Sequence, residues 1–286
     1  MIKHIYENKK PVFSLEIFPP KKETNLDSIY DTVGKLVDLD PDFISVTYGA
    51  AGGTKGSITS DIAGKIKKDY GIEAVAHMTC INSSRKEVRH MIEEMKEKDI
   101  ENVLVLRGDI VPEIEGERDF RHANELAIEI QKIGGMEMLG ACYPEGHYES
   151  DSLDADIQNL KYKIGAGVEA LITQLFFDNR SFYRYVDKVR RAGIDVPISA
   201  GVMPITKSSQ IKRTVELSSA SMPEEFTKMI AKYENDPDGL FEAGVEYAVK
   251  QIRDLIKHGV DGIHLYTMNT PEVADAVYDG ISDLLQ

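Results

Sequence analysis

Eight short apolar segments that alternate with helical patterns constrain the fold of this chain more than any other feature of its sequence. They occupy residues 12–18, 43–47, 74–79, 102–106, 136–143, 170–176, 196–203 and 262–266. Nearly continuous apolar segments of this length are typical of the strands of a parallel sheet that is covered by helices on both faces. Eight such units in one series, without a break in composition, predict an α/β fold of the (β/α)8 TIM barrel type, with residues 1–286 as a single catalytic domain.

The segments between the predicted strands carry the signals that begin and end helices. Ser84 begins one capping box, S-x-x-E, and Ser221 begins another. The long connection between strands seven and eight, residues 205–260, contains at least two helical patterns, at 207–217 and 239–258. We therefore predict an elaborated connection at this point of the barrel.

The composition excludes several classes of function. The 286 residues carry 34 Lys and Arg against 48 Asp and Glu, a formal net charge of -14, which argues against a nucleic-acid or anionic-membrane surface. No apolar run approaches the roughly 20 residues of a membrane span, and the first residues lack the apolar core of a secretion signal, so we expect a cytoplasmic protein. Cys80 and Cys142 each lie in an apolar run, so we expect inert buried thiols, no disulfide framework and no metal site.

A carboxylate, Glu16, lies inside the first apolar segment. Leu15 and Ile17 flank it, and Pro19 and Pro20 end the segment because neither proline can donate to a strand ladder. An ionised carboxylate that is buried without a partner is strongly unfavourable, so the group must pair or hold its proton. Two interpretations follow: a carboxylate paired with a core arginine, or a proton donor at the end of a strand.

Polar or aromatic side chains stand at the carboxyl ends of seven of the eight predicted strands. These side chains are Glu16, Thr47, Tyr48, His77, Thr79, Arg107, Asp109, Tyr143, Gln174 and Tyr266. Because the carboxyl ends of the strands form the active-site face of a barrel, this concentration favours the proton-donor interpretation of Glu16. Taken singly, each side chain also has a structural interpretation, such as a hydrogen-bonded core histidine, a packing tyrosine or a salt-bridged turn.

Three further patterns limit the kinds of ligand and reaction that the sequence supports. The glycine-rich stretch at 49–57 matches neither phosphate-binding glycine motif, which argues against P-loop and Rossmann sites. Strand six ends in Gln174 instead of a lysine, which weakens the case for a Schiff-base aldolase. Asp156, Asn159 and Lys163 are spaced to share one face of a predicted helix, which is either a solvated surface or part of a binding site.

Taken in order, the motifs at the strand ends resemble those of the methylenetetrahydrofolate reductase family. They are S-L-E-I-F-P-P-K from Ser14, V-T-Y-G-A from Val46, A-H-M-T-C from Ala76, L-R-G-D from Leu106, Y-P-E from Tyr143, Q-L-F-F-D from Gln174 and Y-T-M-N from Tyr266. The resemblance extends from about Val12 to Asn269, with a motif at almost every strand end. The chain is most similar to the short bacterial form, which has the catalytic barrel alone.

The resemblance implies a flavin-dependent enzyme. In this family FAD takes a hydride from NAD(P)H and passes it to 5,10-methylenetetrahydrofolate, which becomes 5-methyltetrahydrofolate. By the resemblance, Glu16 is the general acid that protonates the leaving nitrogen of the substrate, and Asp109 is a catalytic residue between the flavin and the folate pterin. A carboxyl group in an apolar site can hold its proton near neutral pH, so this role suits the position of Glu16.

The resemblance also implies a set of binding residues. Those around FAD are Thr47, Tyr48, Ala50, His77, Leu106, Arg107, Gly108, Asp109, Ala123, Tyr143, His147, Asp156, Asn159 and Lys163. Those that face the folate or the nicotinamide are Glu16, Asp109, Gln174, Gln210 and Tyr266. Three positions depart from some relatives: Tyr162 replaces an arginine, Thr214 an aromatic residue and Thr270 a basic residue.

Two alternative functions stay open at this stage. One is a barrel subunit that binds flavin and folate but works only in a complex with an electron-transfer partner. The other is a pterin-binding transferase that uses no flavin. No motif identifies the electron donor, which is NAD(P)H or a partner protein, and the resemblance implies a homo-oligomer.

Overall fold

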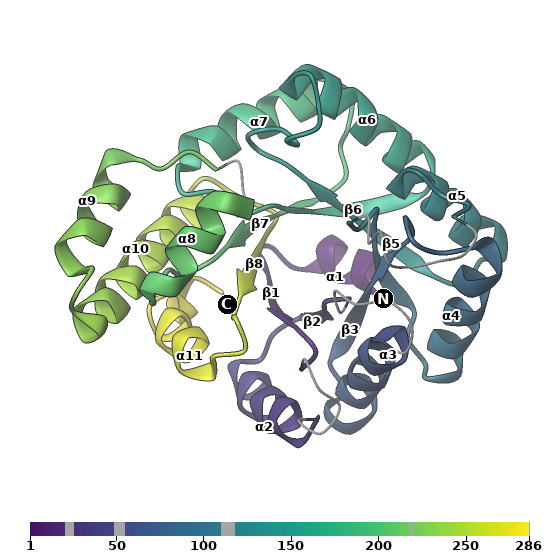
Figure 1. Ribbon diagram of the computed structural model, residues 1–286, viewed down its shortest axis with the longest axis horizontal. Coiled ribbons are helices and arrows are strands. Elements are labelled where there is room, and N and C mark those ends of the chain that lie inside the picture. The colour runs from purple at the N-terminus through teal and green to yellow at the C-terminus, as the bar shows by residue number, and fades with distance from the viewer. Residues whose placement is uncertain (21–25, 49–54, 110–117, 218–219, 286) are drawn as a thin grey trace.

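In the part of the chain that the structure describes, eight parallel strands form a closed barrel in sequence order (Figure 1). The structure is a computed structural model, and it describes residues 1–20, 26–48, 55–109, 118–217 and 220–285. The strands are β1 (Val12–Ile17), β2 (Phe43–Val46), β3 (Glu73–Thr79), β4 (Asn102–Leu106), β5 (Glu137–Cys142), β6 (Val168–Thr173), β7 (Ile198–Val202) and β8 (Gly262–Tyr266). The predicted (β/α)8 barrel is confirmed.

Helices surround the barrel on its outer side, except α1, which lies across the opening of the barrel (Figure 1). They are α1 (Ile2–Asn8), α2 (Leu26–Leu36), α3 (Lys55–Lys65), α4 (Arg85–Glu97), α5 (Ala123–Ile133), α6 (Leu153–Gly165), α7 (Asn179–Arg191), α8 (Ser208–Leu217), α9 (Glu224–Tyr233), α10 (Pro237–Lys257) and α11 (Pro271–Asp279). A 3-10 turn (Val37–Leu39) extends α2, a π-helical turn (Ile66–Tyr70) extends α3, and a second 3-10 turn (Ser282–Leu284) follows α11.

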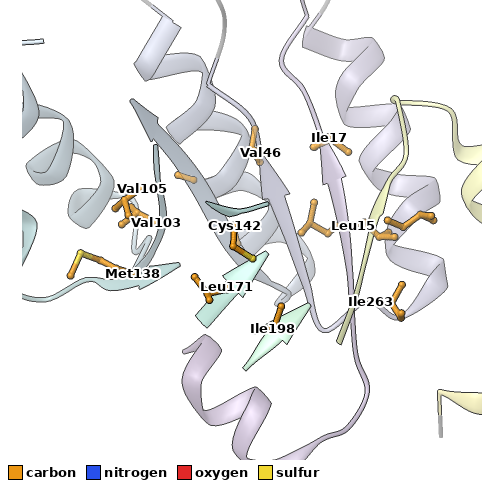
Figure 2. Close-up of a cluster of buried hydrophobic side chains, with 14 of the residues drawn as sticks. Leu15, Ile17, Val46, Val103, Val105, Met138, Cys142, Leu171, Ile198 and Ile263 are labelled. Carbon is orange, nitrogen blue, oxygen red and sulfur yellow. The ribbon is translucent and has the colours of Figure 1, made fainter. Parts of the chain in front are cut away.

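Side chains alternate between the two surfaces of the barrel wall, as the pleat of a strand requires. Leu15 and Ile17 of β1 belong to the large cluster of buried side chains between the strands and the helices, part of which Figure 2 shows. Val12 of the same strand packs in a second cluster with Phe43 and with Ile2 of α1. Since Ile2 is only 1% exposed, α1 contributes to the core inside the barrel, and the even-numbered residues of β1, which include Glu16, belong to the interior.

The connection between β7 and β8 contains α8, α9 and α10, one helix more than the minimum of two that the sequence pattern predicts. The predicted capping box at Ser221 is wrong. Helix α9 has Pro223 as its N-cap, without a capping side chain, and Ser221 instead donates to both oxygens of Glu145 through its backbone amide and its hydroxyl. The capping box at Ser84 is confirmed at the start of α4.

The two thiols agree with the expectation of inert, buried cysteines. Cys80 and Cys142 are both buried and free, and burial raises the pKa of each thiol to about 12. Among the described residues, no helix has the combination of length and apolar character that crossing a membrane demands.

Candidate functional site

Two connected cavities lie where the strands end and their following loops begin. The central cavity has a volume of about 790 Å³ and reaches Glu16, at the carboxyl end of β1. The outer cavity has a volume of about 500 Å³ and extends toward α5 and α6. Residues that line both are Leu106, Arg107, Ala141, Tyr143 and His147. Together the cavities offer one elongated site, of the size that a large cofactor and a substrate need.

Most of the predicted site residues lie around these cavities. The central cavity is lined by Glu16, Thr47, His77, Leu106, Arg107, Gly108, Asp109, Tyr143, His147, Gln174 and Tyr266. The outer cavity adds Ala123, Asp156, Asn159 and Lys163. The expectation that Asp156, Asn159 and Lys163 share one helix face therefore agrees with the structure, where α6 turns that face to the outer cavity.

Two predicted residues are placed differently, and the placement of a third is not described. Tyr48 lines neither cavity, and its hydroxyl lies 3.8 Å from the sulfur of Met91. Gln210 also lines neither cavity; its Oε1 accepts hydrogen bonds from the backbone amides of Thr206 and Lys207, both 2.8 Å away, at the start of α8. Ala50 lies outside the described residues.

In the described chain, the ionisable side chains next to the Glu16 carboxyl group are two histidines. The paired core arginine that the first interpretation of Glu16 expected is not among them. Its Oε2 atom lies 3.4 Å from Nε2 of His77 on β3 and 3.5 Å from Nε2 of His264 on β8. The Glu16 side chain is 19% exposed, so it is partly shielded while it still borders the central cavity. This geometry presents a carboxyl group to whatever occupies that cavity.

The imidazole of His77 is buried and neutral at ordinary pH. Burial is the main cause that lowers its pKa to about 4, the nearby His264 ring lowers it further, and the Glu16 carboxylate opposes the shift. Its Nε2 atom is buried without a hydrogen-bond partner in the described chain. A buried polar atom of this kind is uncommon and marks a position where a bound ligand can supply the missing partner.

The outer cavity carries cations. Lys163 donates from Nζ to the carbonyl oxygen of Ala141 at 2.9 Å, and burial lowers the pKa of its amino group. Arg107, at the junction of the two cavities, forms an ion pair with Glu149, with Nη2 3.0 Å from Oε1. Among the described residues, the ion-pair partner of Arg107 is therefore Glu149, in place of the Asp109 of a salt-bridged turn. Two cations on one elongated cavity suit a ligand with negative charges.

Tyr266 and Gln174 form another part of the central cavity. The Tyr266 hydroxyl donates to the backbone carbonyl of Thr173 at 2.7 Å, so it is held by the barrel wall. Burial raises the pKa of Tyr266 well above its ordinary value. The side-chain oxygen of Gln174 accepts a hydrogen bond from the backbone amide of Leu175 at 3.0 Å. The side-chain amide nitrogen of Gln174 can therefore donate to another group.

The sequence interpretation missed the side chains directly beneath Glu16. Ser14, Ser45 and His264 are each 0% exposed, and they lie inside the barrel. The sequence did contain a signal. Ser14 precedes Glu16 by two residues and His264 precedes Tyr266 by two, and a period of two places side chains on the same surface of a strand.

The closed barrel, with cavities and a largely shielded carboxyl group at the carboxyl ends of its strands, defines a (β/α)8 enzyme. The profile of one family, methylenetetrahydrofolate reductase, matches residues 1–282. The chain belongs to that family of oxidoreductases.

Relatives support this assignment along most of the chain. A 5,10-methylenetetrahydrofolate reductase from Pectobacterium carotovorum subsp. carotovorum is 35% identical over 264 residues, which cover 92% of this chain and 88% of that protein. The 5,10-methylenetetrahydrofolate reductase of Escherichia coli (strain K12) is 33% identical over the same shares of both chains. Among solved structures, an uncharacterized protein from Clostridium thermocellum that binds two copies of 5-methyl-5,6,7,8-tetrahydrofolic acid has the same fold, with a TM-score of 0.69, 12% identity and 99% coverage of both chains.

Proposed function

We propose that this chain is an FAD-dependent reductase that converts 5,10-methylenetetrahydrofolate to 5-methyltetrahydrofolate. The single observation that carries the proposal is the carboxyl group of Glu16, which borders the central cavity between the imidazoles of His77 and His264. Membership of the family supports the reaction, and the proton that the reaction consumes needs a donor at such a position. We expect the enzyme to act in the cytoplasm as a homo-oligomer.

The donor set of the site fits FAD. Arg107 and Lys163 would hold its phosphates, since both cations border the outer cavity, and Asn159 and His147 add polar groups there. The unpartnered Nε2 of His77 is placed to meet a polar ring atom at the central cavity. When bound, FAD would supply the hydride, which it receives from NAD(P)H or from a protein electron donor.

Glu16 supplies the proton in this proposal. The proton passes from the carboxyl group to the leaving nitrogen of the bridged substrate ring, the carbon–nitrogen bond opens, and the resulting iminium carbon accepts the hydride. The nitrogen keeps the electron pair of the broken bond together with the new proton, and the carboxyl group is left as a carboxylate. General acid catalysis of this kind is worth about 10²- to 10⁴-fold in rate.

Other residues of the cavity orient the substrate. Gln174 and Tyr266 border the central cavity and would contact the pterin. Asp109, which is exposed beside the central cavity, places a negative charge there. That charge would disfavour a negative charge on the reduced cofactor and so favour the outward transfer of hydride.

The color and redox behaviour of the purified protein test the proposal. Protein saturated with FAD should be yellow, and anaerobic addition of 5-methyltetrahydrofolate should bleach it because the reaction runs backward to reduced flavin. A colorless protein that takes up no FAD would contradict the proposal and favour a flavin-free transferase. A yellow protein that only a protein donor can make active would identify a subunit of a larger complex. Parallel anaerobic assays with NADH, NADPH and reduced ferredoxin identify the electron donor.

A further inference from the structure

A buried polar group of side chains lies on one wall of the barrel interior, beneath Glu16. Ser14 and His264 are paired residues of the neighbouring strands β1 and β8, and Glu16 is paired with Ser45 of β2. Other residues of the barrel interior, such as Leu104 of β4, are apolar. Burying polar groups is unfavourable unless they are hydrogen-bonded. The hydrogen bonds within this group therefore need an explanation other than apolar packing.

The His264 ring is fixed at both nitrogens and on two sides. Its Nδ1 atom lies 2.7 Å from the hydroxyl of Ser14, and its Nε2 atom lies 3.3 Å from the hydroxyl of Ser45. Phe43 stacks on the ring with a centroid distance of 6.0 Å, and Tyr266 meets it edge-on at 5.4 Å. The imidazole therefore has one orientation, in which Nε2 points to the Glu16 carboxyl group.

The Ser14 hydroxyl links its own hydrogen bonds to the position of the hydrogen on this ring. Its one hydrogen goes either to Nδ1 of His264, 2.7 Å away, or to the carbonyl oxygen of Ile263, 3.2 Å away, and in the second case Nδ1–H donates to the hydroxyl oxygen. When the hydroxyl donates to Nδ1, the neutral imidazole carries its hydrogen on Nε2. That N–H group then lies next to Oε2 of Glu16, at 3.5 Å, and next to the Ser45 hydroxyl.

The two oxygens of Glu16 are consequently not equivalent. Oε2 lies within 3.5 Å of two imidazole nitrogens, whereas no group in the described part of the chain hydrogen-bonds to Oε1. Oε1 is therefore the oxygen that is left for a ligand in the central cavity. The neighbouring histidine, His77, cannot perform the same task as His264 because its Nε2 contact to Glu16 lacks hydrogen-bond geometry.

We propose that His264 is a positioning residue for the general acid, which holds Oε2 of Glu16 so that Oε1 carries the proton to the substrate nitrogen. This inference rests on the proposed function. As the proton leaves Oε1, the negative charge that remains on the carboxylate is stabilised at Oε2 by the Nε2–H group of His264. In this arrangement the Ser14 hydroxyl, 2.7 Å from Nδ1, donates to that nitrogen and so keeps the hydrogen of the ring on Nε2.

Two substitutions of His264 separate positioning from packing. In His264→Gln, the side-chain amide nitrogen can take the place of Nε2 and still donate to Glu16. In His264→Asn, the shorter amide reaches the place of Nδ1, near Ser14, but not the Glu16 carboxyl group. His4→Asn is the matched control, because His4 is exposed on α1. Ser14→Ala removes the partner of Nδ1 with almost no change in volume, so it tests the same contact if the His264 variants do not fold.

The first measurement needs no activity. Infrared spectra of protein labelled with ¹³C-carboxyl glutamate, with the spectrum of Glu16→Gln subtracted, isolate the carboxyl band of Glu16. We expect His264→Asn to shift this band, Ser14→Ala to shift it less, and His264→Gln to return it toward the wild-type position. An unshifted band in His264→Asn and in Ser14→Ala would overturn the inference.

The second measurement follows one half of the reaction. FAD-loaded protein is reduced with dithionite and mixed anaerobically with 5,10-methylenetetrahydrofolate. We expect reoxidation in His264→Asn to be slower by roughly 10- to 100-fold, with a larger solvent deuterium isotope effect, and His264→Gln to recover most of the rate. A wild-type reoxidation rate in His264→Asn, or a loss of rate that His264→Gln does not recover, would overturn the inference about His264 but not the proposed function. Wild-type protein that fails to reoxidise would instead contradict the proposed function.

Discussion

The ring of Tyr266 on β8 occupies the space next to Gly201 on β7 that a side chain at residue 201 would need. A Cβ atom at residue 201 would lie 2.8 Å from the Tyr266 ring and 2.2 Å from the carbonyl oxygen of Thr173, the same oxygen that accepts the Tyr266 hydroxyl hydrogen. Both contacts are shorter than real Cβ contacts, so a side chain at residue 201 must move the barrel wall or the tyrosine. The missing side chain thus fixes where Tyr266 borders the central cavity.

We predict that Gly201→Ala damages folate binding more than Tyr266→Phe does. The alanine must displace backbone, which costs about 1–3 kcal/mol of stability, and it pushes the ring into the cavity. Tyr266→Phe removes only the hydroxyl hydrogen bond, which is worth about 1 kcal/mol. Urea unfolding and titration of the FAD-loaded protein with folate measure the two effects. Equal folate affinity in Gly201→Ala and wild type would show that Tyr266 does not shape the substrate site.

We predict that Glu149→Gln strengthens the binding of FAD. Glu149 neutralises Arg107 at the junction of the two cavities, so its removal leaves the guanidinium free for a phosphate group. The expected gain is about 5-fold in affinity, or roughly 1 kcal/mol, because the pair is partly exposed. It should come with a steeper loss of affinity as salt concentration rises. Flavin titration at two salt concentrations checks this, with the exposed Glu272→Gln as control; weaker binding would mean that Glu149 orients Arg107 for the cofactor.

We predict that His77 makes the protein less stable as the pH falls from about 6.5 to about 4. Its pKa is about 4 in the folded protein and 6.5 in the unfolded chain, so in this interval only the unfolded chain takes up the proton. The effect is absent above pH 6.5 and reaches about 3 kcal/mol at pH 4 and below. The groups that face the ring, Glu16 and His264, are unchanged in His77→Gln, so the difference between the two stability–pH curves isolates His77. Parallel curves would refute the prediction.

We predict opposite outcomes for the two serines that the sequence pattern treats alike. Ser84→Ala should lower stability by about 1 kcal/mol, because its hydroxyl caps α4 by accepting from the backbone amide of Glu87. Ser221→Ala should cost less, because Ser221 is exposed, caps no helix and bonds to Glu145 in a neighbouring loop. Urea unfolding of both variants makes the comparison. A larger loss for Ser221→Ala would show that the loop contact matters more to the fold than the cap.

The fold was predictable because apolar segments and helix signals are local in sequence. Strand β8 has the predicted bounds, Gly262–Tyr266, and the capping box of α4 forms as its spacing indicates. The second capping box failed for a reason outside local sequence: Glu145, on the loop after β5, offers its carboxylate to both donors of Ser221. The sequence around residue 221 gives no indication of an acceptor that is so distant along the chain.

The candidate site was predictable to the extent that strand ends specify it. Glu16, His77 and Tyr266 come together because all strands of a parallel barrel end on the same face. Gln210 was expected in the site, but the N-terminus of α8 leaves backbone amides that need an acceptor, and its side-chain oxygen supplies one. The contact between Glu16 and His264 could not be read from sequence, because it depends on the closure of the barrel between β1 and β8.

The most direct test of the central claim is the effect of Glu16→Gln on the two halves of the reaction, measured by stopped-flow absorbance of the flavin. We predict that the variant binds FAD and is reduced by the electron donor at close to the wild-type rate, because that half needs no proton from Glu16. Reoxidation by 5,10-methylenetetrahydrofolate should fall by about 10²-fold or more, because the substrate nitrogen has lost its acid. Reoxidation of Glu16→Gln at a near-wild-type rate would contradict the account and leave Glu16 as a packing or binding residue.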